Sequence, residues 1–161
     1  MKRIAVATIA CLLIGHGPGL AQSAPPDAGD AKEAVTDARA EAKKSGKYVL
    51  LNFGADWCGE CRQLEKTFAD PTVAKFLRAN FVVVKVPVGQ MVGLNYAEQN
   101  VDLVRKYGVF TTAENAGIPS IVILDSAGNV RGRTDKGEWR RGDAVLPENV
   151  IRDLRRWAPK R

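Results

Sequence analysis

Two cysteines separated by two residues are the side chains in this sequence best suited to chemistry. Cys58 and Cys61 lie in the segment Trp57-Cys58-Gly59-Glu60-Cys61, directly after a short apolar run from Tyr48 to Phe53. A helix that begins at the first cysteine brings its positive dipole end and its free backbone N–H groups to that sulfur, and both favour the nucleophilic thiolate. The second sulfur is expected one turn further and more deeply buried, where it can attack a mixed disulfide. A strand followed by a helix around this pair therefore predicts thiol–disulfide redox chemistry.

The N-terminal segment has the layout of a secretory signal peptide. Met1-Lys2-Arg3 supplies a positive start, an apolar run follows, and Gly19-Leu20-Ala21 offers small residues for cleavage after Ala21. A membrane anchor is less consistent, because a spanning helix needs about 20 apolar residues. We expect a signal peptide over residues 1–21, a flexible lead-in over residues 22–30 and one domain over residues 31–161. The mature product is expected to be soluble outside the cytoplasm, with no transmembrane segment.

Metal binding and a structural disulfide are the competing roles for the cysteine pair. A closed structural zinc site needs about four ligands, and signal cleavage removes Cys11 and His16, the only other cysteine and the only histidine. A zinc ribbon or a histidine-completed copper site is then excluded within one mature chain, whereas a site shared by two chains stays open. A structural disulfide needs neither the preceding buried strand nor the adjacent Trp57. We favour redox chemistry and expect no metal and no organic cofactor.

Apolar periodicity predicts alternating helices and strands over the rest of the chain. Asp70-Pro71 provides an N-cap followed by proline at the first helical position. The predicted elements are a helix over 31–45, a strand over 48–53, a helix bearing Leu64 and Phe68, a helical segment from Asp70, a strand over 81–86, a loop over 87–95, a helix capped at Asn95 and ended by Gly108, a loop over 109–117, strands over 120–124 and 130–134 joined by a turn, and a last helix bearing Leu146 to Trp157.

The basic excess of the chain lies at its C-terminal end. The net charge is +6, and residues 131–161 hold 10 basic and 5 acidic side chains. A positive charge of this kind is compatible with nucleic-acid binding. Export from the cytoplasm argues against it, so we expect no nucleic-acid partner. We favour a solvated basic face and leave attraction to anionic membrane surfaces open.

Two motifs resemble those of the thioredoxin superfamily. The segment Phe53-Gly54-Ala55-Asp56-Trp57-Cys58-Gly59-Glu60-Cys61 resembles its active site, and Gly117-Ile118-Pro119-Ser120 resembles its cis-proline loop. The resemblance extends from Lys47 to Trp157, and exported thioredoxin-like proteins of Gram-negative bacteria are the most similar group. It implies a thioredoxin-like three-layer α/β sandwich, with a mixed central sheet of roughly four strands and helices on both faces.

The resemblance also implies roles for individual residues. Cys58 is the attacking thiolate, and Cys61 is the resolving cysteine. Pro119 is in the cis form, and the backbone of Ile118 pairs with an incoming peptide strand. The substrate-binding residues are then Trp57, Gly59, Glu60, Ile118 and Pro119. Packing alone is the other interpretation of Trp57.

Departures from the family pattern affect the expected chemistry. Many thioredoxins have a buried aspartate six residues before the first cysteine, where this chain has Asn52, which cannot accept a proton at neutral pH. Proton transfer is then left to water, Asp56 or Glu60. Lys85 either matches a lysine that pairs with the family's aspartate, at the position of Asn52, or extends its side chain to solvent. We favour extension to solvent. Glu60, between the cysteines, disfavours the Cys58 thiolate, so we expect a reductant rather than an oxidant.

Together these inferences predict a monomeric disulfide oxidoreductase of the periplasm that acts on thiols and disulfides of exported proteins. No soluble NADPH-linked reductase is expected there, so a membrane electron donor is implied. Two alternatives stay open, a dedicated reductase for cytochrome c maturation and a non-enzymatic client-binding module of the same fold. The stretch over residues 87–117 is longer than in the smallest thioredoxins, and it is either a partner-selecting surface or an ordinary elaboration.

Overall fold

The computed structural model describes residues 31–88, 91–92, 95–96, 100–109, 117–134 and 137–160. The expected signal peptide and lead-in lie outside these residues. The helices are α1 (Ala31–Ser45), α2 (Gly59–Ala69), α3 (Pro71–Asn80), α4 (Val101–Lys106) and α5 (Pro147–Trp157). The strands are β1 (Tyr48–Gly54), β2 (Phe81–Pro87), β3 (Met91–Val92), β4 (Asn95–Tyr96), β5 (Ser120–Leu124) and β6 (Val130–Arg133).

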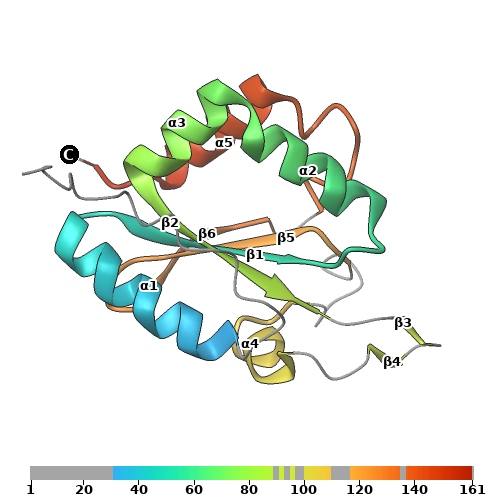
Figure 1. Ribbon diagram of the computed structural model, residues 1–161, viewed down its shortest axis with the longest axis horizontal. Coiled ribbons are helices and arrows are strands. Elements are labelled where there is room, and N and C mark those ends of the chain that lie inside the picture. The colour runs from blue at the N-terminus through green and yellow to red at the C-terminus, as the bar shows by residue number, and fades with distance from the viewer. Residues whose placement is uncertain are drawn as a thin grey trace, which may run out of the picture.

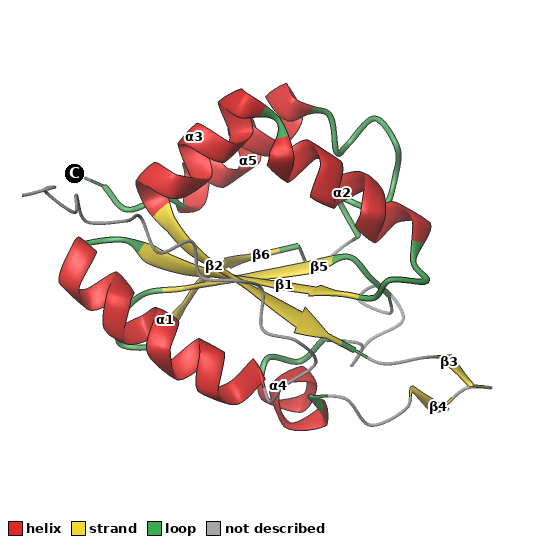
Figure 2. Cartoon of the chain, in the orientation of Figure 1, coloured by secondary structure: helices red, strands yellow, loops and turns green. Residues whose placement is uncertain are grey.

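A four-stranded sheet in the order β2-β1-β5-β6 forms the middle layer of the molecule. β1 and β2 are parallel, whereas β5 is antiparallel to both β1 and β6. The helices α2, α3 and α5 cover one face of this sheet, and α1 and α4 lie on the other (Figure 1; Figure 2). The predicted three-layer α/β sandwich with a mixed sheet is therefore confirmed.

Alternation along β1 divides the apolar core between the two faces of the sheet. Leu51 and Phe53 belong to the core cluster that includes α1, whereas Leu50 belongs to the cluster that includes Leu64 of α2. Because side chains on a strand alternate with a period of two, Asn52 lies on the same face as Leu50, towards α2. A strand covered on both faces has to be almost continuously apolar, as β1 is. Asn52 is the polar exception, and it is buried.

The break between α2 and α3 follows from the sequence Asp70-Pro71. One carboxylate oxygen of Asp70 accepts hydrogen bonds from the backbone N–H groups of Thr72 and Val73, at 2.9 and 3.2 Å. Pro71 stands at the first position of α3, where a helix does not need its N–H. The predicted N-cap is confirmed. The break lets α2 and α3 follow the sheet separately, and α2 begins at the end of β1.

The predicted turn between β5 and β6 is also confirmed, and Asp125 organises it. Its carboxylate accepts hydrogen bonds from the backbone and side-chain N–H groups of Asn129, and it binds the guanidinium of Arg131 at 3.0 Å. Burial alone raises the pKa of Asp125, but the hydrogen bonds from Asn129 and the charge of Arg131 outweigh it and hold that pKa below its usual value. The turn keeps β6 paired to β5.

The expected loop over 87–95 and the helix capped at Asn95 are wrong in part. The short strands β3 and β4 pair there, and α4 begins only at Val101. Asn100 precedes α4 in the left-handed conformation, and its side chain donates to the Pro87 carbonyl oxygen at 2.8 Å and accepts from the Ala31 N–H at 3.1 Å. This amide therefore joins the ends of three elements instead of capping its own helix. A local sequence pattern does not reveal such a distant use of Asn100.

Candidate active site

The turn from β1 into α2 holds the cysteine pair. Cys58 is the N-cap residue of α2, with an extended backbone, and its own N–H donates to the Ala55 carbonyl oxygen at 3.1 Å. Its sulfur accepts a hydrogen bond from the backbone N–H of Cys61 at 3.1 Å. The expected start of a helix at the first cysteine is therefore present. A free N–H at a helix N-terminus stabilises negative charge on the sulfur that it faces.

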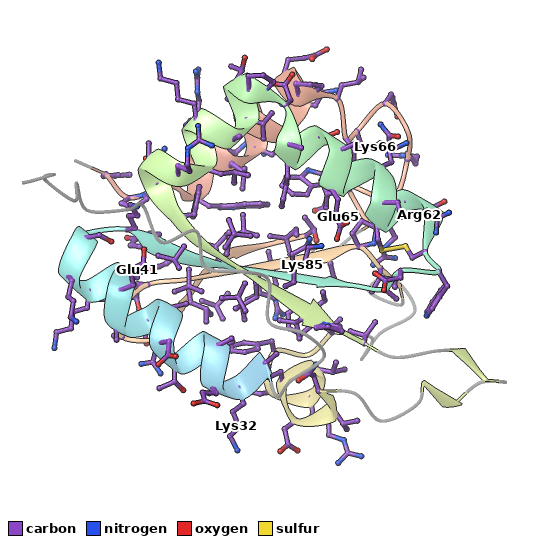
Figure 3. All side chains as sticks on the ribbon, in the orientation of Figure 1. Lys32, Glu41, Arg62, Glu65, Lys66 and Lys85 are labelled. Carbon is purple, nitrogen blue, oxygen red and sulfur yellow. A yellow bond between two sulfur atoms is a disulfide. The ribbon has the colours of Figure 1, made fainter. Side chains whose placement is uncertain are left out.

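Cys58 and Cys61 form a disulfide, with their Cα atoms 5.2 Å apart (Figure 3). The two residues are 5% and 4% exposed, so the expected deeper burial of Cys61 is not seen in this oxidised state. Trp57, by contrast, is 41% exposed directly beside them. A large exposed aromatic side chain next to a nearly covered disulfide offers contact area to an approaching partner.

The loop before β5 faces the first sulfur. β1 and β5 pair with Phe53 opposite Ser120, and this register brings the preceding residues to the cysteine turn. The Ile118–Pro119 peptide bond is cis, as the resemblance implies. The Ile118 carbonyl oxygen lies 3.7 Å from the sulfur of Cys58, although 60 positions separate the two residues. The loop before β5 therefore lies directly beside the first sulfur.

The side chain of Glu60 supplies a negative charge close to the same sulfur. One of its carboxylate oxygens lies 3.9 Å from the sulfur of Cys58. Glu60 and Gly59 are both exposed at the tip of α2, so they belong to the surface around the disulfide. Arg62 also reaches back to this turn, where its guanidinium donates to the Asp56 carbonyl oxygen at 2.5 Å.

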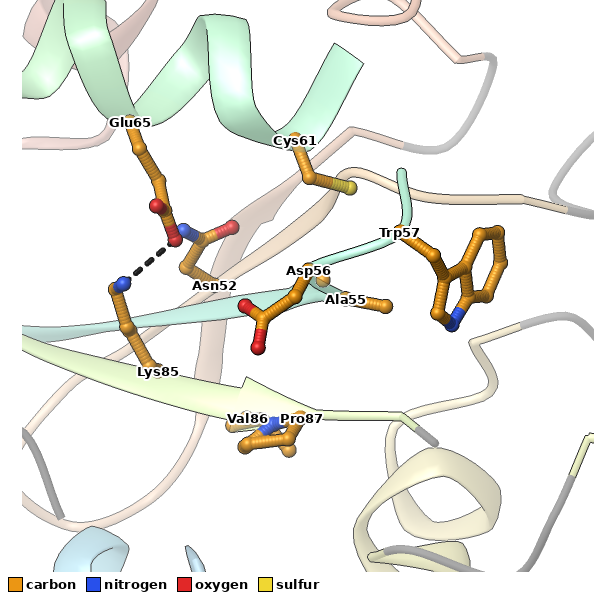
Figure 4. A pocket seen from close by; sticks show the side chains of 10 residues that line it. Asn52, Ala55, Asp56, Trp57, Cys61, Glu65, Lys85, Val86 and Pro87 are labelled. Atoms are coloured by element: carbon orange, nitrogen blue, oxygen red, sulfur yellow. Dashed lines mark ion pairs between the residues drawn. The ribbon is translucent and has the colours of Figure 1, made fainter. Parts of the chain in front are cut away.

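A pocket of about 260 Å³ lies on the other side of the disulfide, against Cys61 (Figure 4). Glu65 of α2 and Lys85 of β2 form an ion pair of 2.6 Å within its lining, with side chains 40% and 49% exposed. Lys85 is exposed, which agrees with the favoured extension to solvent, and its ammonium also binds the carboxylate of Glu65. The oxygen of the Asn52 amide is buried in the same lining and has no hydrogen-bond partner within the described structure.

Glu65 is not among the residues expected from the sequence. It follows Cys61 by four positions on α2, and this spacing puts two side chains on one face of a helix. That spacing is the signal that points to it, but only the position of Lys85 on β2 defines the pocket. Asp56 lines the same pocket from the β1–α2 turn. Asn52, Asp56 and Glu65 thus line the pocket on the Cys61 side of the disulfide, whereas Glu60 lies on the Cys58 side.

The described residues also bear on metal binding and on membrane insertion. They contain no group of three or more His, Cys, Asp or Glu side chains arranged to hold a metal ion. None of the helices that the structure describes is long and apolar enough to cross a membrane.

Comparisons with known proteins agree with this geometry. A family model described as thioredoxin-like matches residues 30–126. The thiol:disulfide interchange protein DsbD of Vibrio vulnificus is 38% identical over 89 residues, which are 55% of this chain and 13% of that protein. This chain therefore spans only a small part of the length of the interchange protein.

Solved structures extend the similarity over most of the described fold. A disulphide isomerase from Xylella fastidiosa is 30% identical, with a TM-score of 0.67, over 81% of this chain and 94% of that chain. The oxidised C-terminal domain of DsbD from Neisseria meningitidis has the same fold, with 21% identity, a TM-score of 0.54 and coverage of 80% of this chain and 96% of that domain.

Removing the charge of Glu60 should make reduced Cys58 more reactive. A carboxylate near a sulfur disfavours the thiolate, and a unit charge at about 4 Å contributes about 1 kcal/mol in water. The Glu60→Gln variant should therefore react with iodoacetamide about fivefold faster than the unchanged protein at pH 6. Glu148→Gln removes an exposed carboxylate of α5 and should leave this rate unchanged. Equal rates for all three proteins would show that Glu60 does not act on Cys58.

Proposed function

This chain belongs to the thioredoxin-like family and performs thiol–disulfide exchange, and we propose that Cys58 and Cys61 are its reacting residues and that it reduces disulfides of exported proteins. The observation that supports this proposal is the bonded cysteine pair at the N-terminus of α2, with its first sulfur 3.7 Å from the carbonyl oxygen of Ile118. The name of the interchange protein, and its similarity to this chain, favour protein disulfides as the substrates.

The exchange takes two displacement steps. The Cys58 thiolate attacks one sulfur of a client disulfide, whose S–S bond breaks, and the other client sulfur leaves as a thiolate and takes up a proton. Cys61 then loses its proton and attacks the sulfur of Cys58, which releases the second client thiolate. Two electrons pass to the client, and the enzyme is left with the Cys58–Cys61 disulfide. The N–H of Cys61 favours the thiolate of Cys58 that begins the cycle.

The residues around the sulfur of Cys58 contact the substrate. Trp57, Gly59 and Glu60 form the exposed rim, and the backbone of Ile118 beside Pro119 pairs with an extended client segment. The proximity of Ile118 to Cys58 supports this assignment, because a strand bound along the loop carries its disulfide directly to the sulfur.

We propose that Glu65, rather than Asp56 or Glu60, accepts the proton that the thiol of Cys61 loses. Glu65 points into the pocket beside Cys61 and Asn52 (Figure 4), and Asn52 has no group that accepts a proton. Lys85 binds the carboxylate of Glu65 at 2.6 Å and holds it in the lining of this pocket, beside Cys61. The pocket has room for water that relays the proton between the two side chains.

The reducing direction rests on Glu60. Strongly oxidising members of this chemistry have a stabilised reduced form. A carboxylate 3.9 Å from the sulfur of Cys58 has the opposite effect, because it disfavours the thiolate of the reduced protein. The signal-like segment over residues 1–21 supports export to the periplasm, where a membrane protein has to supply the electrons.

Replacing the two cysteines separately should divide the reaction into its steps. Cys61→Ser should accumulate a mixed disulfide with a disulfide-bonded peptide, because nothing resolves it, and Cys58→Ser should form none. Mass spectrometry of the quenched mixture measures both adducts. A client-binding module without redox chemistry would keep its function in Cys58→Ser, and a mixed disulfide formed by that variant would contradict the assigned roles.

The reduction potential of the Cys58–Cys61 disulfide should be more negative than that of the strongly oxidising enzymes. We expect a value below about −200 mV, far from the roughly −120 mV of a strongly oxidising enzyme. Equilibration with glutathione redox buffers, followed by thiol alkylation, measures this potential. A value above about −150 mV would rule out the reductant.

Removing the carboxylate of Glu65 should slow only the second step. In Glu65→Gln the first attack should keep its rate, whereas release of the peptide from the mixed disulfide should slow by about a hundredfold, the lower end for loss of a general base. Rapid mixing with a disulfide-bonded peptide and acid quenching resolves the two steps. Asp56→Asn tests the alternative acceptor, and slowing of release by that variant instead of Glu65→Gln would transfer the role to Asp56.

A further inference from the structure

The connection from β6 to α5 carries a buried tryptophan that anchors it. Trp139 is 1% exposed, and its indole N–H donates to Asp153 of α5 at 3.2 Å. Its ring meets Phe68 of α2 edge to face, with 6.2 Å between the ring centroids. The N–H of Arg140 donates to the Gly137 carbonyl oxygen at 3.0 Å and closes a turn around Trp139. The turn is therefore fixed to two helices, and the position of Arg140 is fixed with it.

The guanidinium of Arg140 packs against the backbone of two glycines. A Cβ atom on Gly117 would lie 3.2 Å from Nη1 and 3.3 Å from both Cζ and Nε, so the plane of the guanidinium faces this residue. A Cβ atom on Gly137 would lie 3.0 Å from Nη1. Both glycines have a positive φ, 144° and 66°. Two residues without side chains therefore make the space that the guanidinium fills, and its Nε and Nη2 atoms are buried.

Gly117 is the residue directly before Ile118. The carbonyl oxygen of Ile118 lies 3.7 Å from the sulfur of Cys58, so Arg140 supports the backbone that faces the reacting atom. A small displacement of that backbone changes the path of a bound peptide. Errors of about 1 Å in the position of a substrate reduce rates by about a hundredfold in other enzymes.

We propose that Arg140 is a positioning residue that holds the Gly117–Pro119 loop at the distance from Cys58 that an extended peptide disulfide requires. The inference rests on the function proposed above and adds its substrate class. Peptides that contact the backbone of Ile118 depend on Arg140, whereas small disulfides that contact only the sulfur do not. The planar guanidinium suits the space between two backbones, and the ammonium of lysine does not replace it.

Two substrates separate this role from a general structural one. The reduced protein is mixed rapidly with a disulfide-bonded peptide or with hydroxyethyl disulfide, and the rate is measured against substrate concentration. Arg140→Met and Arg140→Lys should raise the half-saturating concentration of the peptide about tenfold, a modest part of the loss that misplacement causes elsewhere. Their rates with hydroxyethyl disulfide should stay unchanged. Arg141→Met removes the adjacent exposed arginine and should change neither reaction.

A second pair of variants tests the contact itself. Gly137→Ala places a methyl group where the guanidinium lies, so it should raise the half-saturating peptide concentration as Arg140→Met does. Combined with Arg140→Met it should cause little further change, because both substitutions remove the same contact. Gly46→Ala adds a methyl group to open space at a glycine with nearly the same positive φ, 67°, so it controls for backbone strain and should leave the half-saturating peptide concentration unchanged. Near-UV circular dichroism shows whether each variant is folded. If Arg140→Met does not fold, Arg140→Lys and Gly137→Ala still test the proposal.

Four results would overturn the inference. An unchanged half-saturating peptide concentration in the Arg140 variants would remove the positioning role. Equal losses with both substrates would locate the effect at Cys58 or in the fold as a whole, and additive effects of Gly137→Ala and Arg140→Met would exclude their contact as the cause. An unmodified protein that is inactive with both substrates would overturn the proposed function itself, and the inference with it.

Discussion

The hydrogen bond from the backbone N–H of Cys61 to the sulfur of Cys58 is the interaction on which the site depends. It exists because α2 begins directly at the end of β1, so that the sulfur of the N-cap residue accepts an N–H of the first helical turn. The same bond that begins the helix also favours negative charge on the sulfur of Cys58 when the pair is reduced. The strand–helix junction and the chemistry therefore have a common physical origin.

The alternation of side chains between the two faces of β1 decides which residues surround Cys61. Asn52 has to face α2 because Leu50, two positions earlier, packs against that layer. The polar side chain of Asn52 lines a pocket that also has Glu65 and Lys85 at its border. The carboxylate in this lining next to Lys85 is that of Glu65, which comes from α2, whereas the strand position holds Asn52. Lys85 stands opposite Asn52 in the β1–β2 register and comes from the same sheet.

The sequence predicts features that arise from short-range rules, and it misses those that depend on distant contacts. The start of α2, the apolar β1 and the cap at Asp70-Pro71 follow from periodicity and capping within a few residues, whereas the mixed sheet and its layers follow from the resemblance to the thioredoxin superfamily. Asn100 escapes prediction because its amide binds Ala31 and Pro87 rather than its own helix. The position of Arg140 is not predicted because its guanidinium lies in a space left by two glycines, Gly117 and Gly137, that are distant in the sequence.

The two opposing influences on Cys58 differ in their exposure. The amide of Cys61 is covered by protein, whereas Glu60 stands in solvent at the tip of α2. The screening length of dissolved ions is about 8 Å at physiological ionic strength and falls to about 3 Å at 1 M salt, which is shorter than the 3.9 Å from Glu60 to the sulfur of Cys58, and buried partners are screened much less. Added salt therefore weakens the repulsion by Glu60 and leaves the N–H bond in place. A protein exported to a compartment whose ion content follows the surroundings would then become more reactive in saltier media.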